Sequence, residues 1–312
     1  MGTPDFAVPS FRALISEGYE VVGVFCQPDR PKGRGYRLTA CPVKTAALEA
    51  GIPVFQPERI KRPEGVEMLR ALQPDVCVTA AFGQLLSQEI LDIPRHGTIN
   101  VHASLLPRHR GSAPVHYSIL MGDDETGVTT MMTDIGMDTG DILLRARTKI
   151  TPDDTAGTMT DKLALLGAEV LMETLYQLRG GTLKRQPQNE AFATYEPRLT
   201  RESGRIDWTK TRREIDCLAR GMDPWPGAFT TLGDGTVKVF SVRSVSDTPS
   251  AAPGTIVRAD AKQGLIAACG DGDLEIVSLQ MPGQRRMDAK DYLRGHALPA
   301  GTIMGETTNG AE

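Results

Sequence analysis

An amide, an imidazole and a carboxylate are the residues of this sequence whose types and spacing could do chemistry together. Asn100 and His102 lie at the end of the apolar run TINVH, residues 98–102. Because side chains alternate along a strand, both would project from the same face. Asp138 lies in the turn-rich run GMDTGD, residues 136–141. A carboxylate beside a histidine favours the protonated imidazole.

These three groups suit the transfer of an acyl group to an amine. Attack on a carbonyl carbon creates an oxyanion, which an imidazolium and a carboxamide N–H stabilise. A carboxylate and water can relay the proton that the attacking amine loses and the leaving nitrogen gains. Each part also has an ordinary alternative: a hydrogen-bonded histidine that closes a strand, and a polar turn without function.

Several reaction classes lack their usual marker in this sequence. The chain has no GxGxxG run after a strand, no GxxxxGK[ST] loop and no GxSxG elbow. This disfavours hydride transfer, phosphate-loop hydrolysis and elbow-type nucleophilic catalysis.

Three histidines recur at seven-residue intervals from 102 to 116, but Pro107 and Pro114 interrupt any helix that would align them. We therefore expect no metal site.

A second informative stretch runs from Gln27 to Arg37. Residues 27–44 hold five basic side chains and a single acid, Asp29, so this stretch carries a local charge of +4 on a chain whose net charge is −4. The basic residues are Arg30, Lys32, Arg34, Arg37 and Lys44. The stretch is either a solvated surface loop or a clamp for nucleic acid, with Arg34 at its most pliable point between two glycines.

Composition limits the class of protein. The 312 residues suggest about two domains, and 40% apolar with 24% charged residues is typical of a globular protein. No apolar run approaches the roughly 18 residues of a membrane span. Five scattered cysteines without a CxxC pair argue against disulfides and structural zinc. We expect a cytoplasmic protein with no general attraction to membranes or DNA.

The elements that must position the candidate residues follow from an alternation of β-rich and helix-like runs up to about residue 150. This alternation predicts an α/β domain with a Rossmann-like, mainly parallel sheet. A long helix is predicted over residues 155–178 from its apolar periodicity. The β-rich runs lie at residues 20–27, 53–55, 75–81, 98–102, 127–133 and 142–150.

Beyond the polar stretch that begins at Gly180, the pattern changes to short β-like runs separated by Gly/Asp turns. This spacing predicts a small barrel or sandwich. We therefore expect a first domain over residues 1–183, a linker over 184–203 and a second domain over 204–312. We expect Trp208 and Trp225 to be packed in a core. The β-like runs lie at residues 229–232, 237–242, 254–257, 265–269 and 274–279.

Taken together, these residues resemble the methionyl-tRNA formyltransferases. The likeness covers nearly the whole chain and consists of several specific motifs. They are GTPDF at 2–6, QPDRPKGRG at 27–35, NVH and SLLP between 100 and 107, GMDTGD at 136–141, GRIDW at 204–208, PWPGA at 224–228 and RM at 286–287.

The resemblance implies a formyltransferase domain with a parallel sheet and a C-terminal OB-like barrel that helps to hold tRNA. It implies that Asn100, His102 and Asp138 are catalytic. It also implies a formyl donor, 10-formyltetrahydrofolate, and an acceptor, the amino group of initiator methionyl-tRNA. Ser104, Leu105, Leu106 and Pro107 would line the tetrahydrofolate site. We expect the tRNA acceptor arm to contact Arg30, Lys32, Arg34 and Arg37.

Other assignments stay open at this point. Folate-dependent formyltransferases that act on glycinamide ribonucleotide or on nucleotide amino-sugars share the three polar residues, and the basic loop is what separates them from this chain. A degenerate fold that merely binds RNA is a further alternative. In the family, an apolar strand precedes the GTPDF loop. We therefore expect the true start of the protein to lie upstream of Met1.

Overall fold

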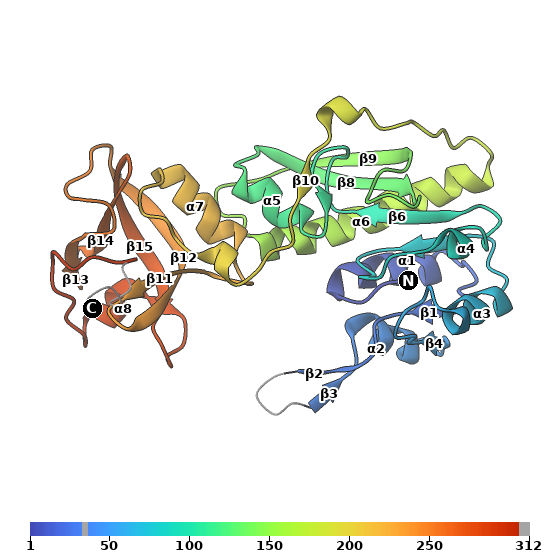
Figure 1. Ribbon diagram of the computed structural model, residues 1–312, viewed down its shortest axis with the longest axis horizontal. Helices are drawn as coiled ribbons and strands as arrows, with labels where there is room; N and C mark the ends of the chain where they lie inside the picture. The colour runs from blue at the N-terminus through green and yellow to red at the C-terminus, as the bar shows by residue number, and fades with distance from the viewer. Residues whose placement is uncertain (33–36, 306–312) are drawn as a thin grey trace. The chain divides into compact units, whose positions relative to one another are not determined.

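The computed structural model describes residues 1–32 and 37–305. It contains two compact units, each formed by several stretches of the chain (Figure 1). The first unit comprises Met1–Pro114, Glu125–Lys149 and Met159–Pro197. The second unit comprises Val115–Asp124, Ile150–Thr158 and Arg198–Glu312. None of the described helices combines the length and the apolar character that crossing a membrane requires.

The first unit is built on short parallel pairs extended by an antiparallel hairpin. β1 pairs with β4 in parallel, and so do β5 and β6. β8 runs antiparallel to β6, and β9 runs antiparallel to β8, which gives the order β5-β6-β8-β9. The strands are β1 (Val24–Phe25), β4 (Val54–Phe55), β5 (Cys77–Thr79), β6 (Thr98–His102), β8 (Glu125–Met132) and β9 (Ile142–Lys149).

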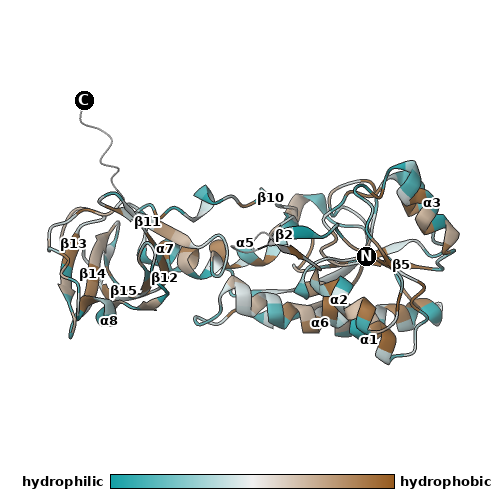
Figure 2. Ribbon diagram, turned by 90° about the horizontal axis from the view of Figure 1, so that it is seen from below, coloured by the Kyte–Doolittle hydropathy of each residue, from teal (hydrophilic) through white to brown (hydrophobic). Residues whose placement is uncertain are grey.

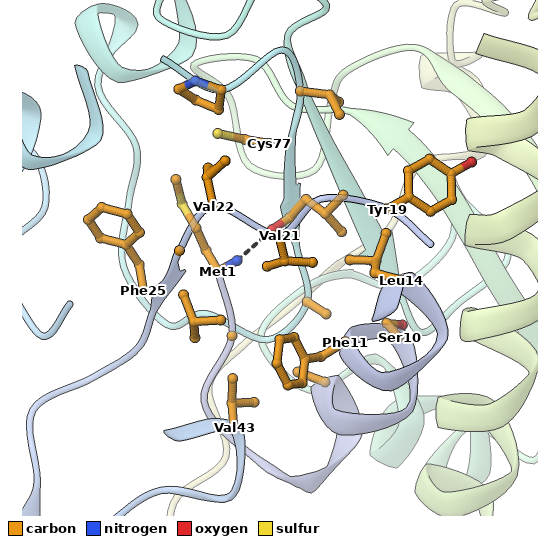
Figure 3. A pocket seen from close by; sticks show the side chains of 18 of the residues that line it. Met1, Ser10, Phe11, Leu14, Tyr19, Val21, Val22, Phe25, Val43 and Cys77 are labelled. Carbon is orange, nitrogen blue, oxygen red and sulfur yellow. Dashed lines mark hydrogen bonds between the residues drawn. The ribbon is translucent and has the colours of Figure 1, made fainter. Parts of the chain in front are cut away.

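The first two residues connect the parallel pairs. The Gly2 amide donates to the Phe25 carbonyl at 3.0 Å, and the Ala80 amide donates to the Met1 carbonyl at 3.0 Å. Beside them lies a cavity of about 150 Å³ lined mainly by apolar residues such as Phe11, Leu14 and Val22 (Figure 3). None of the candidate catalytic residues lines this cavity.

Helices pack on the sheet strands of this unit. α6 packs closely against β6. A Cβ atom added to Gly167 of α6 would lie only 2.9 Å from the Val101 side chain of β6. α2 and α3 begin with a proline, which suits the first helical position because its missing N–H would be unpaired there anyway. Figure 2 shows that α1, α3 and α6 carry both hydrophilic and hydrophobic residues, as helices with one buried side do. The helices are α1 (Val8–Ser16), α2 (Pro42–Glu49), α3 (Pro63–Ala71), α4 (Gln88–Leu91) and α6 (Ala156–Arg179).

The expected Rossmann-like sheet is parallel only in part. β1 and β4 form a parallel pair, as do β5 and β6, whereas β8 pairs antiparallel with β6 and β9 pairs antiparallel with β8. The basic stretch, for which a solvated surface loop and a clamp for nucleic acid were both left open, contains two short strands. β2 (Arg30–Lys32) pairs antiparallel with β3 (Arg37–Thr39).

The second unit contains an antiparallel sheet with the order β11-β12-β15-β14-β13, and β16 pairs with β15. Trp208 is buried, and its indole N–H donates to Thr230 Oγ1 at 3.0 Å. Trp225 is 58% exposed, so the expectation that it packs in a core is wrong. The elements are α5 (Pro114–Leu120), α7 (Arg212–Gly221), β11 (Ala228–Leu232), β12 (Gly235–Ser246), β13 (Ile256–Asp260), β14 (Gly264–Cys269), β15 (Gly272–Gln280), β16 (Met287–Asp288) and α8 (Ala289–Leu293).

Candidate active site

β6 carries Asn100 and His102, two residues apart and therefore on the same side of the strand. Asn100 lies opposite Thr79 of β5, and the Thr79 hydroxyl donates to Asn100 Oδ1 at 2.9 Å. Because the carboxamide oxygen accepts this bond, the NH₂ group is directed away from it. Asn100 thus has a donor available in a fixed orientation, which oxyanion stabilisation requires.

His102 is 6% exposed, and each of its ring nitrogens faces an oxygen. Nδ1 lies 3.7 Å from Asp138 Oδ1, and Nε2 lies 3.0 Å from the His109 carbonyl oxygen. The first distance is that of an ion pair rather than of a hydrogen bond. Because a carbonyl oxygen can only accept, Nε2 is the donor to His109, whereas Nδ1 makes no hydrogen bond to Asp138 at this distance.

Asp138 lies in the connection between β8 and β9 and has a left-handed backbone with φ 55°. One carboxylate oxygen, Oδ2, accepts the Gly111 amide at 2.8 Å, while Oδ1 faces His102. The turn around it is organised by Asp134, whose Oδ1 accepts the Gly136 amide and the Thr139 hydroxyl. The structure therefore brings together the carboxylate and the imidazole, which are 36 residues apart in the sequence.

The sequence analysis missed three of the residues that support this arrangement. Thr79 orients the Asn100 carboxamide, Gly111 holds the Asp138 carboxylate, and Asp134 shapes the turn. Thr79 is a polar residue inside the predicted apolar run at residues 75–81, which was a usable signal. The Gly111 contact depends on a long-range approach between Gly111 and the turn that carries Asp138, and no local pattern indicates it.

The segment Ser104–Pro107 follows β6 directly and is tied to β8. Thr129 Oγ1 donates to the Ser104 carbonyl at 2.7 Å and accepts the Leu106 amide at 3.1 Å. Ser104 and Leu106 are fully buried, whereas Leu105 and Pro107 are partly exposed. Within this segment, Leu105 and Pro107 are therefore the residues whose side chains a ligand could contact.

The basic stretch is anchored at its base by a polar cluster. Lys44 Nζ contacts Asp29 Oδ2 at 2.6 Å and Gln56 Oε1 at 2.7 Å, and Gln56 Nε2 donates to Asp29 Oδ1 at 2.9 Å. The Lys44 hydrogen bond lowers the pKa of the Asp29 carboxyl below its usual value. Lys44 and Asp29 thus neutralise each other.

The positive charge of this stretch therefore comes from its four other basic residues. Arg30 is exposed on β2, Lys32 is the last residue of β2, and Arg37 is the first residue of β3. Arg34 lies outside the described residues. Among residues 1–32 and 37–305, no group of three or more His, Cys, Asp or Glu side chains is arranged to hold a metal ion.

Comparisons with known proteins bear on this site. Residues 1–175 match the family described as formyl transferase, and residues 198–297 match its C-terminal domain. Methionyl-tRNA formyltransferase from Ruminiclostridium cellulolyticum is 49% identical over 308 residues, which cover 98% of either chain. The protein of the same name from Geobacter metallireducens is 50% identical over 305 residues, covering 98% of this chain and 97% of that one.

A solved structure shows the same fold at much lower identity. It is an N-formyltransferase from Helicobacter canadensis, in complex with folinic acid and dTDP-3-aminofucose. It is 17% identical with a TM-score of 0.67, and the match covers 92% of this chain and 97% of that chain. With near 50% identity over almost its full length and both domains matched, the chain belongs to the methionyl-tRNA formyltransferase family.

Proposed function

We propose that this formyltransferase moves the formyl group of 10-formyltetrahydrofolate to the amino group of initiator methionyl-tRNA. The observation that carries the proposal is the pairing of His102 with Asp138 beside Asn100, in a chain about half identical to methionyl-tRNA formyltransferases. The folinic acid in the Helicobacter canadensis complex supports a folate-derived donor. The choice of acceptor follows the relatives of near 50% identity, which are named methionyl-tRNA formyltransferase, and not the amino-sugar of that complex.

In this proposal the amine attacks the formyl carbon, a new C–N bond forms and the bond to the folate nitrogen breaks. The Asn100 N–H and the His102 imidazolium donate to the oxyanion that develops. The Asp138 carboxylate stabilises the imidazolium and, through water, relays the proton that passes from the amine to the leaving nitrogen. The arrangement needs no covalent enzyme intermediate.

The remaining assignments complete the proposal. The partly exposed Leu105 and Pro107 would contact the folate, while the buried Ser104 and Leu106 hold the segment in place. The domain limits of 1–183, 184–203 and 204–312 and the cytoplasmic location expected from the sequence are part of the proposal. So is the OB-like barrel, which the antiparallel sheet of the second unit supports. The tRNA contacts are proposed for Arg30, Lys32, Arg34 and Arg37.

The test is an acceptor comparison with purified protein. Initiator methionyl-tRNA and a nucleotide amino-sugar are each incubated with and without 10-formyltetrahydrofolate, and formylated products are measured by mass spectrometry. We expect N-formylmethionyl-tRNA only when tRNA and donor are both present. Formylation of the amino-sugar alone would overturn the choice of acceptor, and tRNA binding without any transfer would favour the RNA-binding alternative.

A further inference from the structure

Residues 186–196, inside the stretch interpreted as a linker, are fastened to the first unit at both ends. We call these residues the clasp. At one end, Gln186 and Ile142 exchange two backbone hydrogen bonds of 2.8 and 2.9 Å. At the other end, β10 (Tyr195–Glu196) pairs in parallel with β7 (Arg110–Gly111). The clasp therefore runs past the turn that carries Asp138.

Between these two ends, Gln188 contacts the turn directly. Its Nε2 donates to the Asp138 carbonyl at 2.7 Å and to the Gly140 carbonyl at 2.8 Å. Its Oε1 accepts from Arg110 Nε at 3.1 Å and from Arg110 Nη2 at 2.8 Å. These partners fix the orientation of the amide, because a flipped amide would set oxygen against carbonyl oxygens and N–H against a guanidinium.

Arg110 gives Gln188 a rigid anchor. Its residue exposure is 0%, and each of its three guanidinium nitrogens donates to an oxygen of the clasp. Glu190 accepts from Nη1 at 2.9 Å and from Nη2 at 2.7 Å, and Tyr195 accepts from Nη1. The hydrogen bond to Glu190 raises the pKa of the Arg110 guanidinium. A buried charge with this many partners is held in one place.

The turn needs such support because of its backbone. Asp138 has φ 55°, a conformation that residues with a Cβ rarely adopt unless surrounding contacts hold it. The two Gln188 hydrogen bonds hold the turn at the carbonyl of Asp138 and at the carbonyl two residues later. Release of the turn would move Oδ1 relative to His102 Nδ1, which it now faces at 3.7 Å.

We propose that Gln188 is a positioning residue for the formyl-transfer reaction. Anchored on Arg110, it holds the turn of residues 138–140 so that the Asp138 carboxylate faces His102. The clasp then helps to position the catalytic residues and is also part of the connection between the two domains. This inference rests on the proposed catalytic role of Asp138.

The first test is Gln188→Glu. This variant keeps an oxygen for Arg110 but sets an oxygen in place of the NH₂ group against the two turn carbonyls. Because small displacements of catalytic groups cost up to about 100-fold, we expect kcat to fall between about 10- and 100-fold. KM for methionyl-tRNA and for 10-formyltetrahydrofolate should not change, and circular dichroism should show the wild-type fold at the assay temperature.

The matched control is Gln186→Glu, the same change of residue and charge on an exposed side chain of the same clasp. Its kcat should stay within about twofold of the wild type, as for surface changes generally. Gln188→Met, which keeps length but loses both polar atoms, provides a second variant in case the first does not fold. Wild-type kcat in a folded Gln188 variant would overturn the positioning role.

A double-mutant cycle separates this inference from the function on which it rests. If Gln188 acts through Asp138, Gln188→Glu should lower kcat far less in an Asp138→Asn background than in the wild type. An equal loss in both backgrounds would overturn the inference. Full activity of Asp138→Asn alone would instead remove the proposed catalytic role itself. Loss in Asp138→Asn without loss in Gln188→Glu would leave that role standing and reject the positioning.

Discussion

At the scale of single residues, the reaction depends on donors held in place before charge develops. His102 faces Asp138 on one side and the His109 carbonyl on the other, so its ring is fixed without help from a substrate. We expect His102→Ala to lower kcat about 100- to 1,000-fold, the usual cost of removing one oxyanion donor. Single-turnover assays would measure this, with circular dichroism to confirm the fold. Activity within about threefold of the wild type would remove His102 from catalysis.

Asp138→Asn tests charge apart from shape. The substituted side chain is of equal size, and its amide oxygen can still accept the Gly111 N–H that Oδ2 now accepts at 2.8 Å. What is lost is the negative charge beside the His102 imidazolium and the proton relay. We expect a fall in kcat on the order of 100-fold with little change in KM, measured by steady-state kinetics for both substrates. A change confined to KM would show that Asp138 binds substrate and does not assist the reaction.

At the scale of elements, the β7 to β10 pairing should be sensitive to a single methyl group. Gly111 has φ 115°, and a Cβ there would lie 2.8 Å from the Glu196 carbonyl oxygen. Gly111→Ala should therefore separate the clasp from β7, destabilise the protein by about 1–3 kcal/mol and reduce kcat, since the same residue donates to Asp138. Denaturant unfolding and kinetics measure the two effects.

Gly181→Ala is the matched control for that variant. Gly181 also has positive φ, 67°, but a Cβ there meets nothing within 4 Å. It should share the backbone cost of an alanine at positive φ but leave kcat unchanged. Equal kcat losses for both variants would show that backbone strain alone, rather than the contact with Glu196, explains the result.

In the second unit, Trp208 should matter far more to stability than Trp225. Trp208 is buried and donates to Thr230 Oγ1, whereas Trp225 is exposed. We expect Trp208→Ala to lower the free energy of unfolding by about 3–5 kcal/mol, and Trp225→Ala to change it by less than about 0.5 kcal/mol. Urea unfolding followed by circular dichroism measures both. Similar losses would contradict the distinction.

Local patterns account for the parts of the fold and site that could be predicted. The run TINVH was predicted as a strand from its apolar residues, and it forms β6 at residues 98–102. Apolar periodicity predicted α6 to within one residue at either end. The clasp could not be predicted in this way. Gln188 lies 50 residues from Asp138, and a polar, irregular segment held by long-range hydrogen bonds has no period to detect.

At the scale of the whole molecule, a net charge of −4 would repel a polyanion, so binding of tRNA must depend on local positive charge. The basic stretch meets this need. Lys44 and Asp29 neutralise each other, so the formal charge of +4 in this stretch comes from the four other basic residues. They are Arg30, Lys32, Arg34 and Arg37.

Neutralising these four side chains together should weaken tRNA binding and its dependence on salt. Each lost phosphate contact reduces the slope of log affinity against log salt by about 0.7 to 0.9, so four contacts would reduce it by about 3. KM for methionyl-tRNA should rise while affinity for 10-formyltetrahydrofolate stays the same. Arg34→Ala alone should give a smaller change in the same direction.

The control for this experiment changes the overall charge by the same amount at exposed positions elsewhere, with all four residues replaced by glutamine. They are Lys61, Arg62, Lys184 and Arg185. Both proteins then have the same net charge, so a general electrostatic effect would change their salt slopes equally. A local site would flatten the slope of the first variant only, because phosphate contacts and not distant charge release counterions. If the first variant kept the wild-type slope, the stretch would be a solvated hairpin and the tRNA contacts would have to lie elsewhere.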